Sequence, residues 1–254
     1  MKKMYFLRRI FGLATFVVLL SNCSKNDEPT VTAVVPVAPI IPVTPVVTLP
    51  TNGLVAWYPF NGNANDESGN GNNGIVNGGV SLTIDRNNAP NRAYLWPFFG
   101  GQNNFISIGN IHYFIPNSLS FCAWIFMDGG SLGPRIISSG EVGIGTPTTT
   151  NGTRVFNVNY ATSQINSVNI PALSWQHIVY TFNVADGTSR FYVNGVQTNF
   201  ETGGTRTSYS YVNWNIGRKS IPAFDSWGGK IDNVGIWNRA LTSTEVQQLY
   251  VMSN

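Results

Sequence analysis

The loop after the first apolar segment carries oxygen-bearing side chains at a spacing that suits a metal ion. Asp66, Ser68 and Asn70 occupy alternate positions in an asparagine- and glycine-rich stretch, residues 61–74. The glycines let the backbone curl, so that side-chain and carbonyl oxygens can converge. Calcium prefers such a set, with six to eight oxygens at about 2.3–2.6 Å. The spacing predicts a calcium site; the alternative is a hydrogen-bonded turn, because Asp and Asn bond nearby backbone N–H groups without metal.

Catalytic chemistry finds little support in the spacing of acids and nucleophiles. Glycoside hydrolysis needs two carboxyl groups about 5–10 Å apart, and the glutamates stand singly in expected turns, loops or a helix cap. They are Glu67, Glu141, Glu201 and Glu245. No pattern indicates a Ser-His-Asp triad or a zinc site. His177 shares a strand face with Trp175 and Val179, which favours a packed histidine with satisfied hydrogen bonds. From these patterns together we expect no enzyme activity.

Aromatic residues in several loops could contact a sugar ring. Sugar binding needs exposed aromatic planes beside hydrogen-bonding groups. The predicted ligand-contacting residues are Trp96, Tyr113, Tyr211, Trp214 and Trp227. Taken singly, each is more often a core residue than a ligand platform. Their gathering at one end of the fold would favour the binding role.

The chain after Gly53 is a series of short apolar segments separated by Gly- and Asn-rich turns. Many short strands at this spacing predict an all-β sandwich or a closed barrel. An Asn-Gly pair at 194–195 predicts a tight hairpin. The expected strands are 54–60, 105–108, 119–127, 134–138, 154–160, 175–182, 188–194, 196–200, 212–216 and 230–237.

One helix is expected, at the end of the chain. Thr242 and Glu245 have the Thr-x-x-Glu spacing of a capping box, and Leu241 with Val246 fits the flanking apolar staple. Val246 and Leu249 then fall on one helical face. Asp232, in the strand before this helix, is a single carboxylate within an apolar pattern.

The first 22 residues are expected to be a lipoprotein signal peptide. A basic start precedes an apolar run, residues 10–20, which is shorter than the ~20 residues that a spanning helix needs. The next residues, Leu-Ser-Asn-Cys, resemble the bacterial lipobox, with Asn22 where Gly or Ala is commoner. That resemblance implies acylation of Cys23 and stable membrane anchoring. The alternative is ordinary secretion with an unmodified cysteine.

Residues 23–52 are expected to be a lipidated N-terminus and a proline-rich stalk. Prolines recur at every third position from Pro36 to Pro45, which is the period of polyproline II and predicts a stiff spacer. A short acidic tract, residues 24–28, resembles the export signal of Bacteroidetes surface lipoproteins. It implies a surface-exposed outer-membrane lipoprotein whose folded domain covers 53–254.

The net charge and the cysteine content limit the kinds of binding partner and of disulfide to be expected. The net charge is +3, but four of the 15 basic residues lie in the expected signal peptide, which leaves 11 against 12 acidic residues. There is therefore no electrostatic case for nucleic acid. Cys122, the second cysteine, lies in an apolar run. We expect it to be a buried small hydrophobe without a disulfide partner.

Several segments carry motifs of one known family. The closing stretch Gly-Lys-Ile-Asp-Asn-Val-Gly-Ile-Trp-Asn-Arg-Ala-Leu, residues 229–241, is joined by motifs at 55–60, 175–195 and 215–218. Together they resemble the laminin G-like jelly-roll family of the concanavalin A-like lectin/glucanase superfamily, with departures at Asn233 and Gly235. The resemblance spans nearly all of residues 53–250. It implies an antiparallel jelly-roll β-sandwich with a short C-terminal helix.

The resemblance also implies a structural calcium and a binding function. In many relatives the two corresponding aspartates help to bind calcium, which here would be Asp66 and Asp232, with Ser68 and Asn70 in the same loop. The Glu-x-Asp-x-x-Glu run of the glucanase members is absent. We therefore expect non-catalytic binding of a glycan or a surface protein. The alternatives are an unusual glycan hydrolase and a passive structural or adhesive module.

Overall fold

The computed structural model describes residues 47–97, 103–111, 117–128, 135–139, 142–150, 153–158, 165–206, 213–218 and 227–252. The chain divides between Thr44 and Pro45, and every described residue belongs to the second unit. The expected signal peptide, Cys23 and most of the expected stalk lie outside the described residues. The folded unit begins before residue 53, because the carbonyl of Pro50 accepts a hydrogen bond from Trp237 Nε1 at 2.8 Å. The described part contains no helix of the length and hydrophobicity needed to span a membrane.

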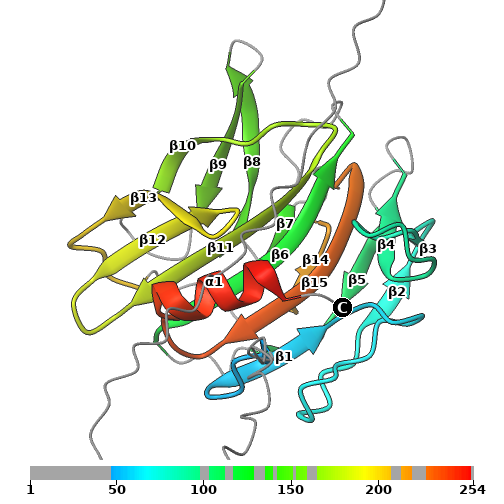
Figure 1. Ribbon diagram of the computed structural model, residues 1–254, viewed down its shortest axis with the longest axis horizontal. Coiled ribbons are helices and arrows are strands. Elements are labelled where there is room, and N and C mark those ends of the chain that lie inside the picture. Colours follow the sequence, from blue (N-terminus) through cyan, green and yellow to red (C-terminus); the bar gives the residue numbers. More distant parts are fainter. Residues whose placement is uncertain are drawn as a thin grey trace, which may run out of the picture. The chain divides into compact units, whose positions relative to one another are not determined.

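Two antiparallel sheets make up the fold of the described residues, as Figure 1 shows. The first sheet has eight strands. Its order is β13 (Val196–Glu201), β12 (Thr188–Val193), β11 (Trp175–Asn183), β6 (Leu119–Met127), β15 (Gly229–Trp237), β4 (Ala93–Trp96) and β3 (Ser81–Thr83), with β1 (Leu54–Tyr58) also paired to β15.

The second sheet has seven strands. Its order is β10 (Ile165–Asn169), β9 (Thr153–Val158), β8 (Val142–Thr150), β7 (Arg135–Ser139), β14 (Asn215–Ile216), β5 (Phe105–Ser107) and β2 (Ile75–Asn77). This arrangement confirms the predicted antiparallel β-sandwich.

Each predicted strand overlaps an observed one, and three of the five strands that were missed, β2, β3 and β8, have weak local signals. β2 and β3 have three residues each, with largely exposed side chains, so neither shows apolar alternation. β8 contains two glycines and a proline, which are disfavoured within strands. β4 and β10 were also missed.

Strand β15 is flanked on both sides within the first sheet. One edge pairs with β6, while the other pairs first with β4 and then with β1. The register shifts between Asp232 and Gly235, and Asn233 adopts a φ of 49° at this point. The bulge falls where the sequence departs from the family motif, at Asn233 and Gly235. It also brings β1, the first strand, beside the last one.

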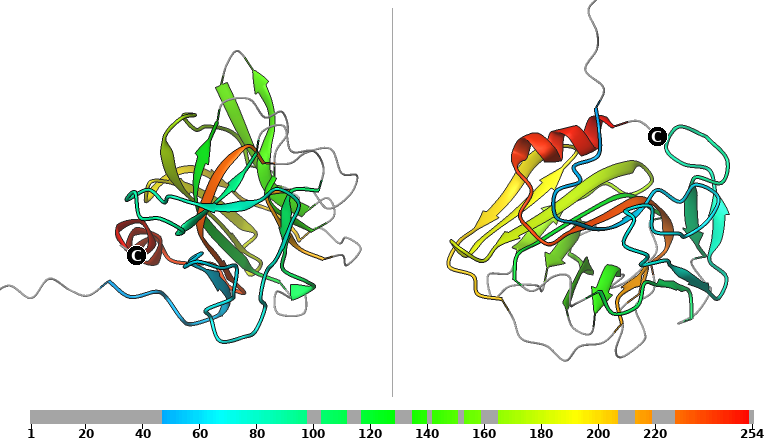
Figure 2. Two further views of the ribbon diagram at one scale, coloured as in Figure 1. Left: turned by 90° about the vertical axis from the view of Figure 1, so that its right-hand side faces the viewer. Right: turned by 90° about the horizontal axis from the view of Figure 1, so that it is seen from below.

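The sheets bury one apolar core between them, and a second cluster lies under helix α1 (Ser243–Val251). Figure 2 shows α1 on the outer face of the first sheet, with the second sheet on the opposite side. Val246 and Leu249 of α1 pack there with Cys122 and Val179. Cys122 is buried and free, as predicted. Burial raises the pKa of its thiol, so it is not a reactive nucleophile.

The helix begins as its sequence predicts. The Thr242 hydroxyl accepts a hydrogen bond from the backbone N–H of Glu245 at 3.2 Å, and the Glu245 carboxylate accepts one from the backbone N–H of Thr242 at 2.8 Å. This reciprocal pair is a capping box. Leu241 and Val246 belong to the same buried cluster, which confirms the apolar staple and fixes the chain's entry into the helix.

Candidate functional site

Asp66 is the centre of the loop between β1 and β2. Its Oδ1 accepts hydrogen bonds from the backbone N–H groups of Trp57 and Ser68, each at 2.9 Å. Its Oδ2 accepts one from the N–H of Asn72 at 2.9 Å. The carboxylate is buried, so these bonds supply the polar partners that it needs. Asp66 therefore closes the loop and fastens it to β1.

The other polar side chains of this loop donate to β1. Asn70 Nδ2 donates to the carbonyls of Leu54 and Val55 at 2.9 and 3.0 Å, and Ser68 Oγ donates to Val55 at 3.3 Å. β1 pairs only with β15 among the described strands, so its other edge would expose these carbonyls. The loop thus matches the hydrogen-bonded turn that the sequence offers as the alternative to a metal site.

Asp232 has a different partner. Its Oδ2 accepts a hydrogen bond from Arg86 Nη1 at 2.8 Å, and its side chain is fully buried. Arg86, in the loop between β3 and β4, also donates from Nη2 to the carbonyl of Met252 at 3.1 Å. Its guanidinium carbon lies 4.6 Å from the centre of the Trp124 ring. Burial, reinforced by the charge of Asp85, raises the pKa of Asp232 to about 7 against the effect of Arg86.

The structure does not bring Asp66 and Asp232 to a common partner. Asp66 is bonded to Trp57, which pairs with Gly235, three residues beyond Asp232 on β15. Within the described ranges no three His, Cys, Asp or Glu side chains are grouped as a metal would require. With Asp66 bonded to N–H groups and Asp232 to Arg86, these residues do not fit one calcium ion, and the ion stays a prediction of the sequence.

His177 belongs to an aromatic stack around Arg86. Its ring centre lies 5.2 Å from that of Trp124 and 5.9 Å from that of Tyr250 on α1. His177 is buried, as predicted, but its Nδ1 has no hydrogen-bond partner among the described residues. Burial and then the charge of Arg86 lower the pKa of His177 to about 3. The imidazole is thus neutral at physiological pH and inaccessible as a general base.

The predicted sugar-contacting tryptophans are part of the core. Trp96, Trp214 and Trp227 are 0%, 3% and 1% exposed, so they offer no ring face to a ligand, and the prediction is wrong for these three. Trp96 and Trp227 do approach each other through Gly217. A Cβ placed on Gly217 would lie 2.0 Å from Trp96 Nε1, and the Trp227 N–H donates to the Gly217 carbonyl at 2.7 Å.

Tyr113 and Tyr211, the other two predicted contacts, lie outside the described residues. Three exposed apolar side chains that the sequence did not single out lie on edge strands: Ile75 on β2, and Val196 and Phe200 on β13. The Arg190 guanidinium carbon lies 5.0 Å from the centre of the Phe200 ring. Only the strand order shows that these strands are sheet edges.

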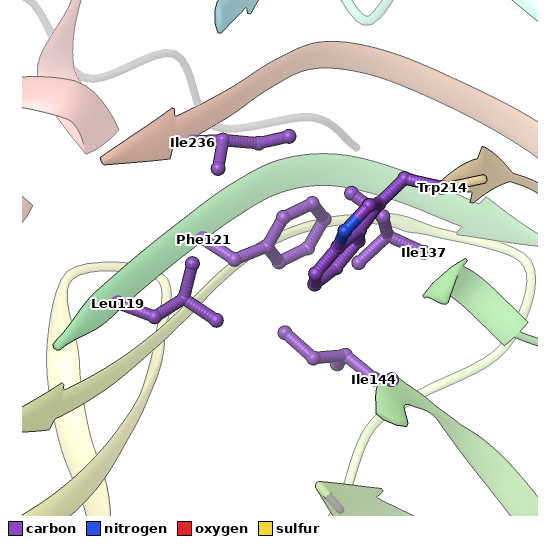
Figure 3. Close-up of a pocket in the computed structure, with 7 residues that line it drawn as sticks. Leu119, Phe121, Ile137, Ile144, Trp214 and Ile236 are labelled. Carbon is purple, nitrogen blue, oxygen red and sulfur yellow. The ribbon is translucent and has the colours of Figure 1, made fainter. Parts of the chain in front are cut away.

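A small apolar pocket lies between the two sheets, and Figure 3 shows its lining. The lining residues are Leu119, Phe121, Ile137, Gly143, Ile144, Trp214 and Ile236. They come from both sheets, and the indole Nε1 of Trp214 has no hydrogen-bond partner among the described residues. The pocket has no carboxylate and no nucleophile in its lining, so it offers no catalytic chemistry.

These features define a two-sheet antiparallel β-sandwich whose buried acids serve the fold. The family model for the concanavalin A-like lectin/glucanases superfamily, Laminin_G_3, matches residues 99–247, and the chain belongs to this family. No curated protein matches the chain.

Solved structures with the same fold include domain 4 of AbnA, a GH43 extracellular arabinanase from Geobacillus stearothermophilus, in complex with arabinotriose. It has 19% sequence identity and a TM-score of 0.60, and the match covers 78% of this chain and 98% of that domain. At such identity the similarity shows the fold alone.

Two similar structures are of the botulinum neurotoxin DC binding domain. The complex with rat synaptotagmin II has 18% identity and a TM-score of 0.60, with 79% of this chain and 51% of that chain covered. The complex with SialylT has 16% identity and a TM-score of 0.59, with the same coverage of 79% and 51%. The chain thus spans about half the length of these toxin domains.

Proposed function

We propose that this protein is a non-catalytic glycan-binding module. The observation that carries the non-catalytic part of the proposal is that the buried carboxylates are bonded to other groups of the fold. Asp66 accepts three backbone N–H groups, Asp85 accepts two, and Asp232 is bonded to Arg86. Glycoside hydrolysis needs two carboxyl groups that reach the substrate on either side of its glycosidic bond. Asp85 and Asp232 are 1% and 0% exposed, so no substrate can reach them.

The share of each solved structure that the match covers favours a glycan over a protein as the ligand. The domain in complex with arabinotriose is covered along 98% of its length. The toxin domain in complex with synaptotagmin II is covered along 51%, so half of that chain has no counterpart here. Binding to a surface protein is the second candidate function, and the fold accommodates either.

The proposal includes a membrane tether. Acylation of Cys23 would anchor the chain in the outer membrane, and the proline-rich stalk would hold the module at the cell surface. Its support is the sequence: a basic and apolar leader, a lipobox-like Leu-Ser-Asn-Cys, and prolines at every third position.

A Cys23→Ser chain is expected to move from the membrane fraction to the soluble fraction. The lipobox resemblance assigns the lipid to the thiol of Cys23, so removal of the thiol should abolish the anchor. Fractionation of expressing cells followed by immunodetection measures the change, and Ser21→Ala, which leaves the thiol in place, is the matched control. Equal membrane retention of the Cys23→Ser chain and the unaltered chain would contradict the tether.

The full chain carrying Cys23→Ser is expected to be retained by at least one insoluble polysaccharide. The first to test is arabinan, followed by xylan, cellulose and other plant and microbial glycans. A soluble oligosaccharide of the same sugar should elute the protein, because it competes for the same site. Heat-unfolded protein is the control for adsorption to the solid. Retention by none of the panel would reject glycan binding and favour the protein ligand.

A further inference from the structure

We infer that Arg86 is the internal cation of this domain: it takes the place at Asp232 that the family resemblance assigns to calcium, and it joins the last strand, the C-terminal helix and the β3–β4 loop without a metal. The inference concerns how the fold is closed and is independent of the glycan proposal. It begins from a disagreement, because the carboxylate expected to bind calcium is bonded instead to a guanidinium.

The contacts of Arg86 use several parts of its side chain. Nη1 donates to Asp232 Oδ2 at 2.8 Å, and Nη2 donates to the Met252 carbonyl at 3.1 Å. The planar group also lies over the Trp124 ring, at 4.6 Å. A guanidinium can donate in two directions and stack at the same time, whereas an ammonium is a point charge. The site thus fits arginine specifically.

The three contacts fall on segments far apart in the sequence. Asp232 is 146 residues from Arg86, and Met252 is 166 residues from it. Trp124 stacks on Tyr250 of α1, with ring centres 5.7 Å apart and planes at 21°. The Arg86 side chain is therefore held between the outer face of the first sheet and the end of the helix. Its loss would loosen both.

The charge balance of the site also requires a cation. Asp85 and Asp232 are both buried, and Asp85 Oδ2 and Asp232 Oδ1 have no hydrogen-bond partner among the described residues. Removing one partner of a buried ion pair leaves a charge that neither water nor protein compensates. Arg86 supplies that positive charge at Asp232. Calcium at Asp232 would have to displace it.

The test compares Arg86→Met with Arg92→Met, which removes the other arginine of the same loop. Thermal unfolding is followed at pH 8, above the pKa of about 7 to which burial raises Asp232. Arg86→Met should lower the Tm by roughly 10 °C, and Arg92→Met should lower it far less. Arg86→Lys should fall between Arg86→Met and the unaltered chain, because it keeps the charge but loses the fork and the stacking. Amide hydrogen exchange of residues 246–251 should become faster in Arg86→Met.

The second arm measures the effect of metal on the same chains. The Tm of the unaltered chain should be the same in excess calcium and in EDTA. A calcium-dependent rise that disappears in Asp232→Asn would overturn the inference, because the ion would then occupy the place assigned to Arg86. Equal Tm changes in Arg86→Met and Arg92→Met would overturn it as well. If Arg86→Met does not fold, the Tm of Arg86→Lys and the Tm of the unaltered chain with and without calcium still test the inference.

Discussion

Replacing Gly217 with alanine is expected to destabilise the domain by about 3–5 kcal/mol. Gly217 has a φ of 82°, and an added Cβ would lie 2.0 Å from Trp96 Nε1. A left-handed conformation costs a non-glycine residue about 1–3 kcal/mol, and overpacking a dense core costs about 1–3 kcal/mol more. Trp96 is buried and cannot swing into solvent. Chemical denaturation with fluorescence detection measures the loss of unfolding free energy.

Gly62→Ala is the matched control. Gly62 has a similar φ of 79°, and a Cβ there would meet no atom within 4 Å. It therefore incurs the backbone strain alone, about 1–2 kcal/mol. The difference between the two variants isolates the contact of residue 217 with Trp96. Equal losses of unfolding free energy would show that Trp96 moves to make room for the added Cβ. That result would contradict rigid packing around Trp96.

Asp66→Ala is the second substitution with a large expected effect, again about 3–5 kcal/mol. It removes the acceptor of three backbone N–H groups, those of Trp57, Ser68 and Asn72. A buried donor left without a partner costs about 1–3 kcal/mol. Asp66→Asn keeps one side-chain carbonyl oxygen and should show a smaller loss. Glu67→Ala changes an exposed neighbouring acid and should stay within about 0.5 kcal/mol of the unaltered chain.

The same variants separate the two interpretations of the loop. If Asp66 serves as a hydrogen-bond acceptor, the loss on Asp66→Ala is equal in calcium and in EDTA. If Asp66 is a calcium ligand, the unaltered chain is stabilised by calcium and Asp66→Ala is not, because only the folded state with the site intact binds the ion. The hydrogen bonds of the structure predict the first result.

Local sequence signals account for most of what could be predicted. The capping box at Thr242 and the hairpin at Asn194 and Gly195, with φ of 50° and 79°, depend on neighbours within a few residues. Strands β6 and β11 are long and apolar, so their periodicity is clear. Each of these features depends on residues close to it in the sequence, so the sequence alone is enough to predict it.

The parts that the sequence did not predict depend on register and distance. Trp96 and Trp227 have loop-like neighbours in the sequence, and only the pairing of β4 with β15 shows that they lie at a packed junction. Arg86 carries no local signal, and its ion pair with Asp232 spans 146 residues. The resemblance implied calcium as the partner of Asp232, whereas the structure places Arg86 there. The chemical nature of that partner required the three-dimensional arrangement.

Together these observations describe a sandwich whose buried carboxylates hold the chain and are unavailable for catalysis. Asp66 fastens the first loop to β1, while Asp232 and Arg86 join the last strand to the C-terminal helix. The first and last strands lie side by side, since β1 pairs with β15. In a domain closed in this way, the buried carboxylates of Asp66, Asp85 and Asp232 are bonded within the fold.

The most direct measurement is the release of reducing sugar from the polysaccharide that retains the protein. The retained complex is incubated for hours, and the supernatant is assayed for new reducing ends beside a protein-free blank. The account predicts retention with no release above the blank, because the buried acids of the described residues are bonded within the fold. Reducing ends that accumulate in proportion to protein and time would contradict it.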